Sequence, residues 1–397
     1  MAVLVTGFGV VSAIGNNVEE NLLSLKNSKS GIGKSQFLDS NFAKDLLFGE
    51  VKRATKTFLQ NLSLKNEKGF TRTDVFALTA VKEAVSMAHL TENDLSSFDT
   101  AIVSSSTVGG MVETDSLYND ANLPSGGSEY LSSYGSGVHL VKLVEYFQIK
   151  GLTDTINTAC SSSANAIMLG YKLIQSKRAT RVIVGGTDSL SKFTVNGFNS
   201  LQILSKEFCK PFDNNRTGLN LGEGAGYLIL ESSEVVGDKK VYAEITGYGN
   251  SNDAFHPTAL SDDANGVVRS ISEALLKAKI KESEIDYINT HGTATQNNDA
   301  TELLGMSKVF SKIPAFNSTK SYTGHTLAAS GVIEAIFSIL SIQNNELYAS
   351  LNCEDSISNE GPITKYRDNQ TIKHVLSNSF GFGGNCTSLI ISKVSIN

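Results

Sequence analysis

Three side chains in this sequence have the types and settings that nucleophilic chemistry needs. Cys160 stands between a strand-like segment, residues 153–158, and an apolar helical segment, residues 164–174. A thiol at a helix N-terminus meets unpaired backbone N–H groups, which predict a lowered pKa and a reactive thiolate. His291 and His325 each stand beside glycine and hydroxyl residues, which leave room for a ligand. Each of the three residues alone could equally be structural, but together they predict a nucleophile with two polar partners.

A glycine-rich stretch near the C-terminus is a fourth candidate element. Residues 378–385, Asn-Ser-Phe-Gly-Phe-Gly-Gly-Asn, place three glycines around Phe380 and Phe382. We predict a mobile loop whose backbone N–H groups meet an oxyanion and whose rings cover a pocket. A phosphate cradle is not favoured, because no helix follows this stretch.

The composition argues against several other classes of protein. The chain has 397 residues, with 34 Lys+Arg against 40 Asp+Glu, so no basic excess points to nucleic acid as a partner. Its four cysteines are widely spaced, which predicts neither a zinc site nor a disulfide framework and favours a cytoplasmic location. The longest apolar segment, Leu327 to Leu340, is short for a bilayer and carries Glu334, so no membrane span is predicted.

Strand-like and helical segments alternate along the chain, which predicts an α/β protein with a mainly parallel sheet. The predicted strands are residues 2–6, 101–105, 153–158, 181–185, 226–231, 241–249, 285–290, 373–377 and 386–393. The predicted helices are residues 74–89, 111–118, 138–147, 164–174, 266–278, 299–310 and 327–342, the second of them within an irregular insertion, residues 107–137.

The layout of these elements predicts two similar halves. A strand with glycines opens each half, at Val3 to Gly9 and again at Ala243 to Gly249, and the joint lies near Ser233 to Lys240. We interpret Gly7 and Gly9 as turn residues. Ser12 interrupts the G-x-G-x-x-G pattern, so a dinucleotide site is not favoured.

Six segments, in this order, carry a family resemblance. They read VTGFGVVSAIGNN, TACSSSANAI, PFDNNRTGLNLGEGAG, NTHGTAT, STKSYTGH and NSFGFGGN, and they span nearly the whole chain. In these motifs the chain resembles the elongating (type I/II) β-ketoacyl-acyl carrier protein synthases of the thiolase superfamily. The resemblance implies a thiolase-like five-layer αβαβα fold with two pseudo-symmetric halves and mixed sheets. Residues 1–238 would form the half with the nucleophile and residues 239–397 the half with both histidines.

The resemblance also implies a role for each matching residue. Cys160 would carry the acyl chain, while His291 and His325 would promote decarboxylation of a malonyl extender and stabilise the enolate. Lys320 would set the electrostatics around the histidines. Backbone N–H groups of Cys160 and Phe382 would form an oxyanion hole. The substrate-binding positions would be Thr293, Thr295, Phe380, Val108 and Phe198.

The implied function is a decarboxylating Claisen condensation in fatty-acid chain elongation. An acyl-enzyme thioester and malonyl-acyl carrier protein would give 3-oxoacyl-acyl carrier protein and CO2. One alternative is a ketosynthase of a secondary pathway, type II polyketide or aryl polyene, which would work with a chain-length-factor partner; the unusual region Thr107 to Tyr134 motivates it. A non-catalytic partner subunit is a second alternative, which the presence of Cys160 with both histidines disfavours.

The implied partners are an acyl carrier protein, in acyl and malonyl forms, and a second subunit. The subunits would form a homodimer, or a heterodimer with a chain-length factor. No cofactor is expected, since phosphopantetheine arrives on the carrier protein, but Asn289, Glu334 and Ser377 match a structural Na+ or K+ site. Three basic runs could dock an acidic carrier protein or could be solvated faces. They are Lys52-Arg53, Lys65 to Arg72 and Lys177-Arg178.

Overall fold

The computed structural model describes residues 1–64, 68–123 and 127–394, which form one body around a ten-stranded sheet. The strands are β1 (Val3–Ser12), β2 (Thr100–Ser105), β3 (Thr153–Ile156), β4 (Arg181–Asp188), β5 (Gly224–Ser232), β6 (Ala243–Asn252), β7 (Tyr287–Asn289), β8 (Ala315–Asn317), β9 (His374–Gly381) and β10 (Asn385–Ser392). The α-helices are α1 (Val18–Lys26), α2 (Thr55–Leu62), α3 (Arg72–Met87), α4 (Glu92–Leu95), α5 (Thr114–Ala121), α6 (Val138–Phe147), α7 (Ser162–Gln175), α8 (Lys192–Ser200), α9 (Asn265–Ala278), α10 (Gln296–Val309), α11 (Lys320–Thr323) and α12 (Ser330–Asn344). The 3-10 helices are η1 (Gly109–Glu113), η2 (Leu131–Ser133), η3 (Glu282–Glu284) and η4 (Leu327–Ala329).

The sheet consists of two five-stranded halves with mirrored order. One half runs β3-β2-β4-β5-β1 and the other β8-β7-β9-β10-β6, and a short antiparallel β1–β6 pair joins them at Val5 and Ala243. In each half the two outermost pairings are parallel and the remaining ones antiparallel. The predicted halves and mixed sheets are therefore present. The prediction of a mainly parallel sheet was wrong, because alternation along the chain does not reveal which strands pair.

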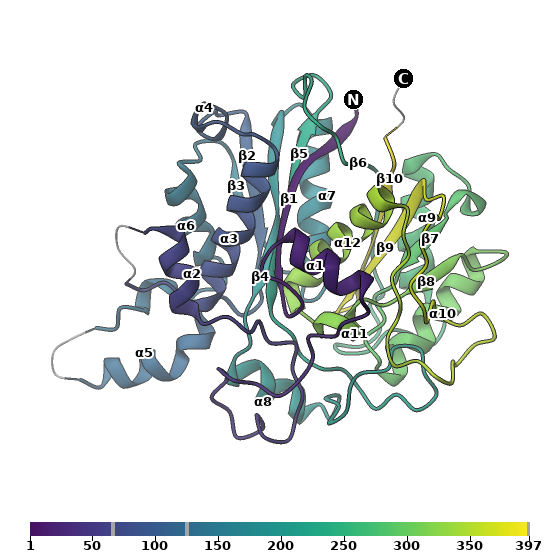
Figure 1. Cartoon of the computed structure of the whole chain (residues 1–397), viewed down its shortest axis with the longest axis horizontal. Helices are drawn as coiled ribbons and strands as arrows, with labels where there is room; N and C mark the ends of the chain where they lie inside the picture. The colour runs from purple at the N-terminus through teal and green to yellow at the C-terminus, as the bar shows by residue number, and fades with distance from the viewer. Residues whose placement is uncertain (65–67, 124–126, 395–397) are drawn as a thin grey trace.

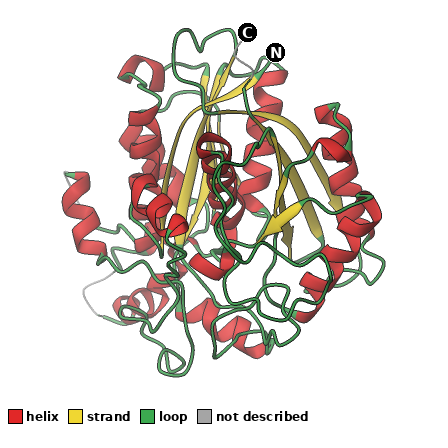
Figure 2. Cartoon of the chain, turned by 45° about the vertical axis from the view of Figure 1, so that its right-hand side comes forward, coloured by secondary structure: helices red, strands yellow, loops and turns green. Residues whose placement is uncertain are grey.

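Helices cover both sides of each half and also fill the space between them. Figures 1 and 2 show α3 and α6 outside the first half, α7 and α12 between the halves, and α9 and α10 outside the second. Side chains alternate along the strands accordingly: Val182 and Val184 of β4 face the central layer, whereas Ile183 faces α3 and α6. Helices thus cover both faces of the sheet, and the five-layer αβαβα arrangement is confirmed.

Close helix packing explains the glycines that open each half. Gly9 lies inside β1, where a Cβ atom would stand 2.1 Å from the Ala80 carbonyl oxygen of α3. Gly249 of β6 meets α9 in the same way, 1.9 Å from the Ser270 carbonyl oxygen. Our interpretation of the first glycines as turn residues was wrong, since both strands continue past them and glycine is needed to admit the helix.

The most apolar helical segment lies in the central layer. Leu327–Asn344, which is η4 followed by α12, is long and apolar enough to cross a membrane, but 89% of it is buried inside the protein. A helix that is apolar on all sides is also typical of the core of a globular protein, and the burial of this helix fits that role.

Most predicted elements are present within a few residues of their predicted ends, and α6 has the predicted bounds. Asn378–Gly381, which we predicted as part of a mobile loop, is instead the end of β9, because it pairs with β10. Only Phe382, Gly383 and Gly384 form the hairpin tip. The sequence analysis missed the helices α1, α2, α4, α8 and α11 and the strand β8, which are short, polar or both. The predicted 238/239 boundary falls in the connection between β5 and β6 and stays a prediction.

Leu173 of α7 offers a direct test of the central layer. Its side chain is 2% exposed within the largest apolar cluster, so Leu173→Ala should lower the free energy of unfolding by about 2–5 kcal/mol. The matched control is Leu276→Ala in α9, which is 77% exposed and should cost less than about 0.5 kcal/mol. Denaturant titration of both variants measures the difference, and equal losses would contradict a packed middle layer.

Candidate active site

Cys160 lies at the tight turn that joins β3 to α7. Ala159 holds a left-handed backbone, φ 53°, which turns the chain so that the next residue opens the helix. The Thr158 N–H donates to Ser162 Oγ at 2.9 Å, and the Ser161 hydroxyl donates to the Asn385 side chain at 2.8 Å. The turn is thus tied to β10 of the other half, and the sulfur sits at the N-terminus of α7.

The two histidines meet this sulfur from the second half of the chain. His291 follows β7, and His325 follows α11 across Gly324, whose φ of 69° favours glycine. One ligand atom from each of Cys160, His291 and His325 lies within 4.8 Å of the other two, and all three residues are buried. The structure therefore brings together the three residues that the sequence analysis singled out.

Fixed donors settle which ring nitrogen of each histidine carries the proton. The Leu327 backbone N–H donates to Nδ1 of His325 at 3.1 Å, and the Lys320 ammonium lies 3.2 Å from Nδ1 of His291. Burial first, and then the Lys320 charge, hold the pKa of both imidazoles well below 6.5, so both rings are neutral. A neutral ring whose Nδ1 accepts a hydrogen bond carries its proton on Nε2. Both histidines thus offer an Nε2–H donor, whereas a metal ligand needs the opposite arrangement.

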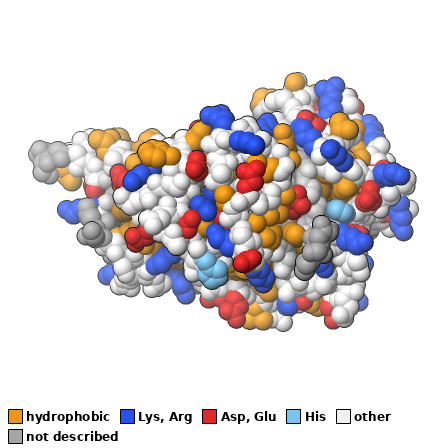
Figure 3. All heavy atoms as spheres, turned by 90° about the horizontal axis from the view of Figure 1, so that it is seen from above, with side chains coloured by type: hydrophobic (Ala, Val, Ile, Leu, Met, Phe, Trp, Pro, Cys, Tyr) orange, Lys and Arg blue, Asp and Glu red, His pale blue; other side chains and the backbone are white. Residues whose placement is uncertain are grey.

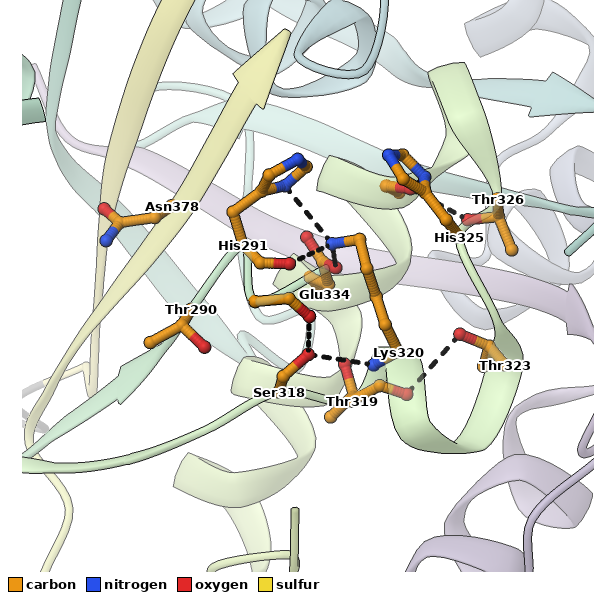
Figure 4. A network of polar contacts seen from close by, with 12 residues as sticks. Thr290, His291, Ser318, Thr319, Lys320, Thr323, His325, Thr326, Glu334 and Asn378 are labelled. Atoms are coloured by element: carbon orange, nitrogen blue, oxygen red, sulfur yellow. Dashed lines mark hydrogen bonds and ion pairs between the residues drawn. The ribbon is translucent and has the colours of Figure 1, made fainter. Parts of the chain in front are cut away.

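Lys320 is the hub of the polar network (Figure 4). Its ammonium forms an ion pair with Glu334 of α12 and donates to the His291 carbonyl oxygen at 2.7 Å. Lys320 and Glu334 are both 2% exposed, so each charge is compensated by the other. Burial raises the pKa of Glu334 to about 7, whereas the neighbouring ammonium lowers it.

The pKa of the nucleophile corrects one prediction. Burial raises the pKa of the Cys160 thiol to about 11, although Lys320 and the backbone N–H groups of Phe382 and Cys160 lower it. The lowered pKa that we predicted from the helix N-terminus was wrong, because loss of hydration outweighs the nearby donors. The sulfur is therefore a thiol, and those two N–H groups are directed at it.

Glu302 is a positioning residue that the sequence analysis missed. It is fully buried on α10, and its two carboxylate oxygens accept the backbone N–H groups of His291 and Gly292 at 2.9 and 2.8 Å. Asn378 of β9 donates to the same carboxylate at 3.1 Å. Glu302 lies eleven residues after His291, a spacing that does not indicate a contact in the sequence. The contact forms only because α10 packs beside the His291 backbone.

A cavity of about 370 Å³ opens beside the sulfur. Phe198 and Phe382 stack at its wall with ring centroids 5.7 Å apart, and Phe380 contacts His291 at 5.7 Å. Val108 does not line the cavity, but it is buried in the apolar cluster that contains Phe198. The other predicted side chains at the cavity are Cys160, His291, His325, Thr293 and Thr295.

The predicted cation site shows unsatisfied polar atoms. Asn289 of β7 and Ser377 of β9 are register partners, and Glu334 lies on α12, which packs against β9. Both side-chain polar atoms of Asn289, Ser377 Oγ and one Glu334 oxygen are buried without a hydrogen-bond partner. Buried oxygens in this state fit a hard monovalent cation.

We compared the positions of the three basic runs with that of the active site. Their places and ion pairs give little support to the docking of an acidic carrier protein there. Lys177-Arg178 follows the C-terminal end of α7, whereas Cys160 precedes its N-terminal end, and the helix between them is about 21 Å long. Figure 3 shows that the face carrying the chain termini has positive and negative side chains interspersed. Arg72 is buried in an ion pair with Glu223, and Lys52 pairs with Glu50. Residues 65–67 lie outside the described residues.

Comparison with known proteins identifies the family. The profile described as Beta-ketoacyl synthase, N-terminal domain, matches residues 1–235, and the profile for the C-terminal domain matches residues 242–354. The chain belongs to the β-ketoacyl synthase family. The predicted family is thereby confirmed, and so is its thiolase-like fold.

Relatives of this β-ketoacyl synthase match it over almost its whole length. The 3-oxoacyl-[acyl-carrier-protein] synthase 1 of Haemophilus influenzae is 31% identical and synthase 2 of Synechocystis sp. is 32% identical, with 98% of each chain covered. Among solved structures, the ishigamide ketosynthase/chain length factor superposes with a TM-score of 0.92 at 28% identity over 99% of both chains. A ketosynthase in complex with its chain length factor from Xenorhabdus doucetiae gives 0.85 at 28%, covering 99% of this chain and 98% of that one.

The raised pKa of Cys160 predicts slow alkylation at neutral pH. Iodoacetamide attacks thiolate, so the rate at Cys160 should rise about tenfold per pH unit from about pH 7 to 10, without a plateau near neutrality. Lys320→Met should slow it further at fixed pH, since the ammonium lowers this pKa. The exposed Lys312→Met is the control. Peptide mass spectrometry reads the rate, and a plateau below pH 8 would contradict the raised pKa.

Proposed function

We propose that this protein catalyses a decarboxylating Claisen condensation between an acyl-enzyme thioester and malonyl-acyl carrier protein, elongating a fatty-acyl chain. One observation carries the proposal: a buried thiol and the Nε2–H donors of two neutral histidines converge on one cavity. This set combines a nucleophile that is also a leaving group with two donors for a thioester oxygen. The names of its relatives support the same reaction and substrate class.

In the first half-reaction the acyl group moves to Cys160. The sulfur attacks the carbonyl carbon of the acyl-carrier thioester, and the carbon–sulfur bond to the carrier breaks. The thiol proton of Cys160 ends on the departing carrier sulfur, so no net charge is created. The N–H groups of Cys160 and Phe382 stabilise the transient oxyanion, because they already converge on the attacking sulfur.

In the second half-reaction malonyl-carrier thioester loses CO2. The carbon–carbon bond to the carboxylate breaks and its electron pair becomes an enolate, whose oxygen accepts from the Nε2–H groups of His291 and His325. Each such donor is worth about 3 kcal/mol in transition-state stabilisation. Thr293 and Thr295 line the cavity with hydroxyls 2.9 Å apart, which supports a role in hydrogen-bonding the carrier's pantetheine arm.

Condensation returns the enzyme to its starting state. The enolate carbon attacks the Cys160 thioester, a carbon–carbon bond forms, and the carbon–sulfur bond to the enzyme breaks. The released thiolate takes a proton from water, and the raised pKa of Cys160 favours its return to the thiol. Acyl carrier, malonyl carrier and one proton thus give 3-oxoacyl carrier, free carrier and CO2.

No redox or phosphate cofactor enters these steps. A Na+ or K+ ion held by Asn289, Glu334 and Ser377 would be structural and would satisfy their orphaned oxygens. Four buried free cysteines suit a reducing, cytoplasmic environment.

We further propose that the enzyme works as a homodimer joined at β3. This edge strand is exposed at Thr153, Asp154 and Thr155, whereas β8, its counterpart in the other half, is largely buried. Exposed strand edges invite pairing with a second chain. Val141 of α6, which packs against β3, is exposed and apolar, and so are Tyr118, Leu123 and Leu131 of the insertion that precedes α6.

Leu131→Asp should therefore shift the protein from dimer to monomer at micromolar concentration. Placing a charge in a desolvated apolar contact costs binding free energy. The control is Leu276→Asp, another exposed leucine, which should leave the dimer intact. Light scattering after size exclusion measures the mass. A wild-type chain that is monomeric alone and dimerises only with a non-catalytic relative would instead indicate a heterodimer.

A secondary-pathway ketosynthase is the second candidate function. The TM-score of 0.92 with the ishigamide ketosynthase/chain length factor favours it, as does the insertion that carries η1, α5 and η2. The two candidates share the chemistry and differ in the acyl chain and in the partner subunit. Product masses from saturated and polyunsaturated acyl-carrier primers separate them.

Cys160 variants test the condensation itself. Cys160→Ala should abolish 3-oxoacyl product, because no acyl-enzyme can form. Cys160→Gln should lose condensation yet release CO2 from malonyl-carrier protein, since both histidine donors remain. Intact-mass spectrometry of the carrier species and 14CO2 release measure the two activities. Retained condensation in either variant would refute the role given to Cys160.

A further inference from the structure

Asp188, the last residue of β4, is a fully buried carboxylate that the proposed reaction does not use. It lies in the first half of the chain, among the strands that carry the cysteine turn. Its hydrogen bonds reach two separate turns, one after β2 and one at the start of η4. A buried carboxylate with partners on several elements fixes those elements relative to one another.

The first turn, Ser106 to Val108, gives this carboxylate most of its donors. The Ser106 hydroxyl and the Val108 N–H donate to Oδ1 at 2.7 and 2.9 Å. The Thr107 hydroxyl donates to Oδ2 at 2.6 Å, and the Thr107 N–H lies 3.0 Å from Oδ1. The turn is therefore defined by Asp188.

The second turn supplies one donor, the Ala328 N–H, to Oδ2 at 2.8 Å. The preceding residue, Leu327, has a left-handed backbone with φ 53°, a conformation that costs a non-glycine residue about 1 kcal/mol or more. The Leu327 N–H is the group that donates to Nδ1 of His325 at 3.1 Å. The Asp188–Ala328 bond thus holds in place the amide that selects the His325 tautomer.

Both turns also contribute to one apolar wall. The side chains of Val108 and Leu327 are buried in the same cluster as Phe198 and Leu219, which line the cavity beside Cys160. An acyl chain that presses on this wall presses on both turns that Asp188 connects. Asp188 therefore holds both the apolar wall of the cavity and the turn whose Leu327 N–H bonds His325.

We propose that Asp188 is a positioning residue that couples the wall of the acyl cavity to the donor state of His325. The inference rests on the proposed function, and it assigns the coupling to the Oδ2–Ala328 bond. An occupied cavity stabilises the wall, and through Asp188 it stabilises the Nε2–H donor that decarboxylation needs. Decarboxylation is in this way favoured after Cys160 has been loaded.

Asp188→Asn breaks this link selectively. The amide oxygen can keep the three donors of Oδ1, which are the Ser106 hydroxyl and the Thr107 and Val108 N–H groups. The amide NH2 takes the place of Oδ2. The Thr107 hydroxyl can rotate to accept from this NH2, but the Ala328 N–H cannot, because two donors do not bond. Malonyl decarboxylation should fall about 10- to 100-fold. Acylation of Cys160 should stay within about threefold, and the lost negative charge acts in its favour, because Asp188 raises the pKa of the Cys160 thiol.

Two separate assays measure the effect. Intact-mass spectrometry follows acyl transfer from acyl-carrier protein to Cys160, and 14CO2 release follows decarboxylation of malonyl-carrier protein. The control is Glu231→Gln, which alters another fully buried carboxylate. Glu231 pairs with Arg181 at 2.8 Å, and Arg181 lies at the opposite end of β4 from Asp188. It should change both rates by the same factor, if at all.

A spectroscopic readout separates positioning from simple destabilisation. In 15N-histidine-labelled enzyme, His325 should show a protonated Nε2 and an unprotonated Nδ1, and Asp188→Asn should populate the other tautomer. An unchanged tautomer, or equal loss of acylation and decarboxylation, overturns the inference. A wild-type enzyme that neither accepts an acyl group nor releases CO2 overturns the proposed function instead.

Discussion

A buried ammonium group is the interaction on which the polar centre of this molecule depends. Lys320 is 2% exposed, and a charge in that position is tolerated only when it is paired and hydrogen-bonded. Glu334 supplies the opposite charge from α12, while His291 supplies two further acceptors. Removing one partner of such a pair costs about 3–5 kcal/mol, because the other charge is left uncompensated. The ion pair therefore fixes α11, α12 and the strand end that carries His291 as one unit.

This arrangement keeps every reacting group neutral until substrate arrives. The thiol holds its proton, and both imidazoles are uncharged with their donors turned toward the sulfur. Negative charge develops on substrate oxygens during the reaction, where donors are already oriented and no solvent must reorganise. A buried site that held free thiolate and imidazolium would have to offset their desolvation in the resting state.

The pseudo-symmetric halves explain why such a site can exist at all. Each half contributes one central helix, α7 or α12, and one half brings the cysteine while the other brings both histidines. Within the sheet the halves meet at a short β1–β6 pairing, and isolated bridges such as Leu221 to His325 add backbone links between them. Packing of the central layer contributes the apolar part of the alignment. Side-chain bonds such as Ser161 to Asn385 then tie the nucleophile turn across the interface between the halves.

Local pattern alone determined much about this protein. Cys160, His291 and His325 stand out because small and hydroxyl residues surround them, and the order of six motifs is sufficient to indicate the family and its layered fold. Helices such as α6 follow from apolar spacing, since a period near 3.6 is a property of the segment itself. The repeat of a glycine-bearing strand also predicted the two halves correctly.

Tertiary structure decided what depends on burial and on distant neighbours. The pKa of Cys160 rises because the surrounding protein excludes water, which outweighs the helix terminus that the sequence displays. Gly9 and Gly249 are explained by helices that pack on their strands, not by local turns. Glu302 and Asp188 acquire meaning only when folding brings them to the histidine backbone and to Leu327. Hydration and contact are properties of the folded arrangement, so no window of sequence contains them.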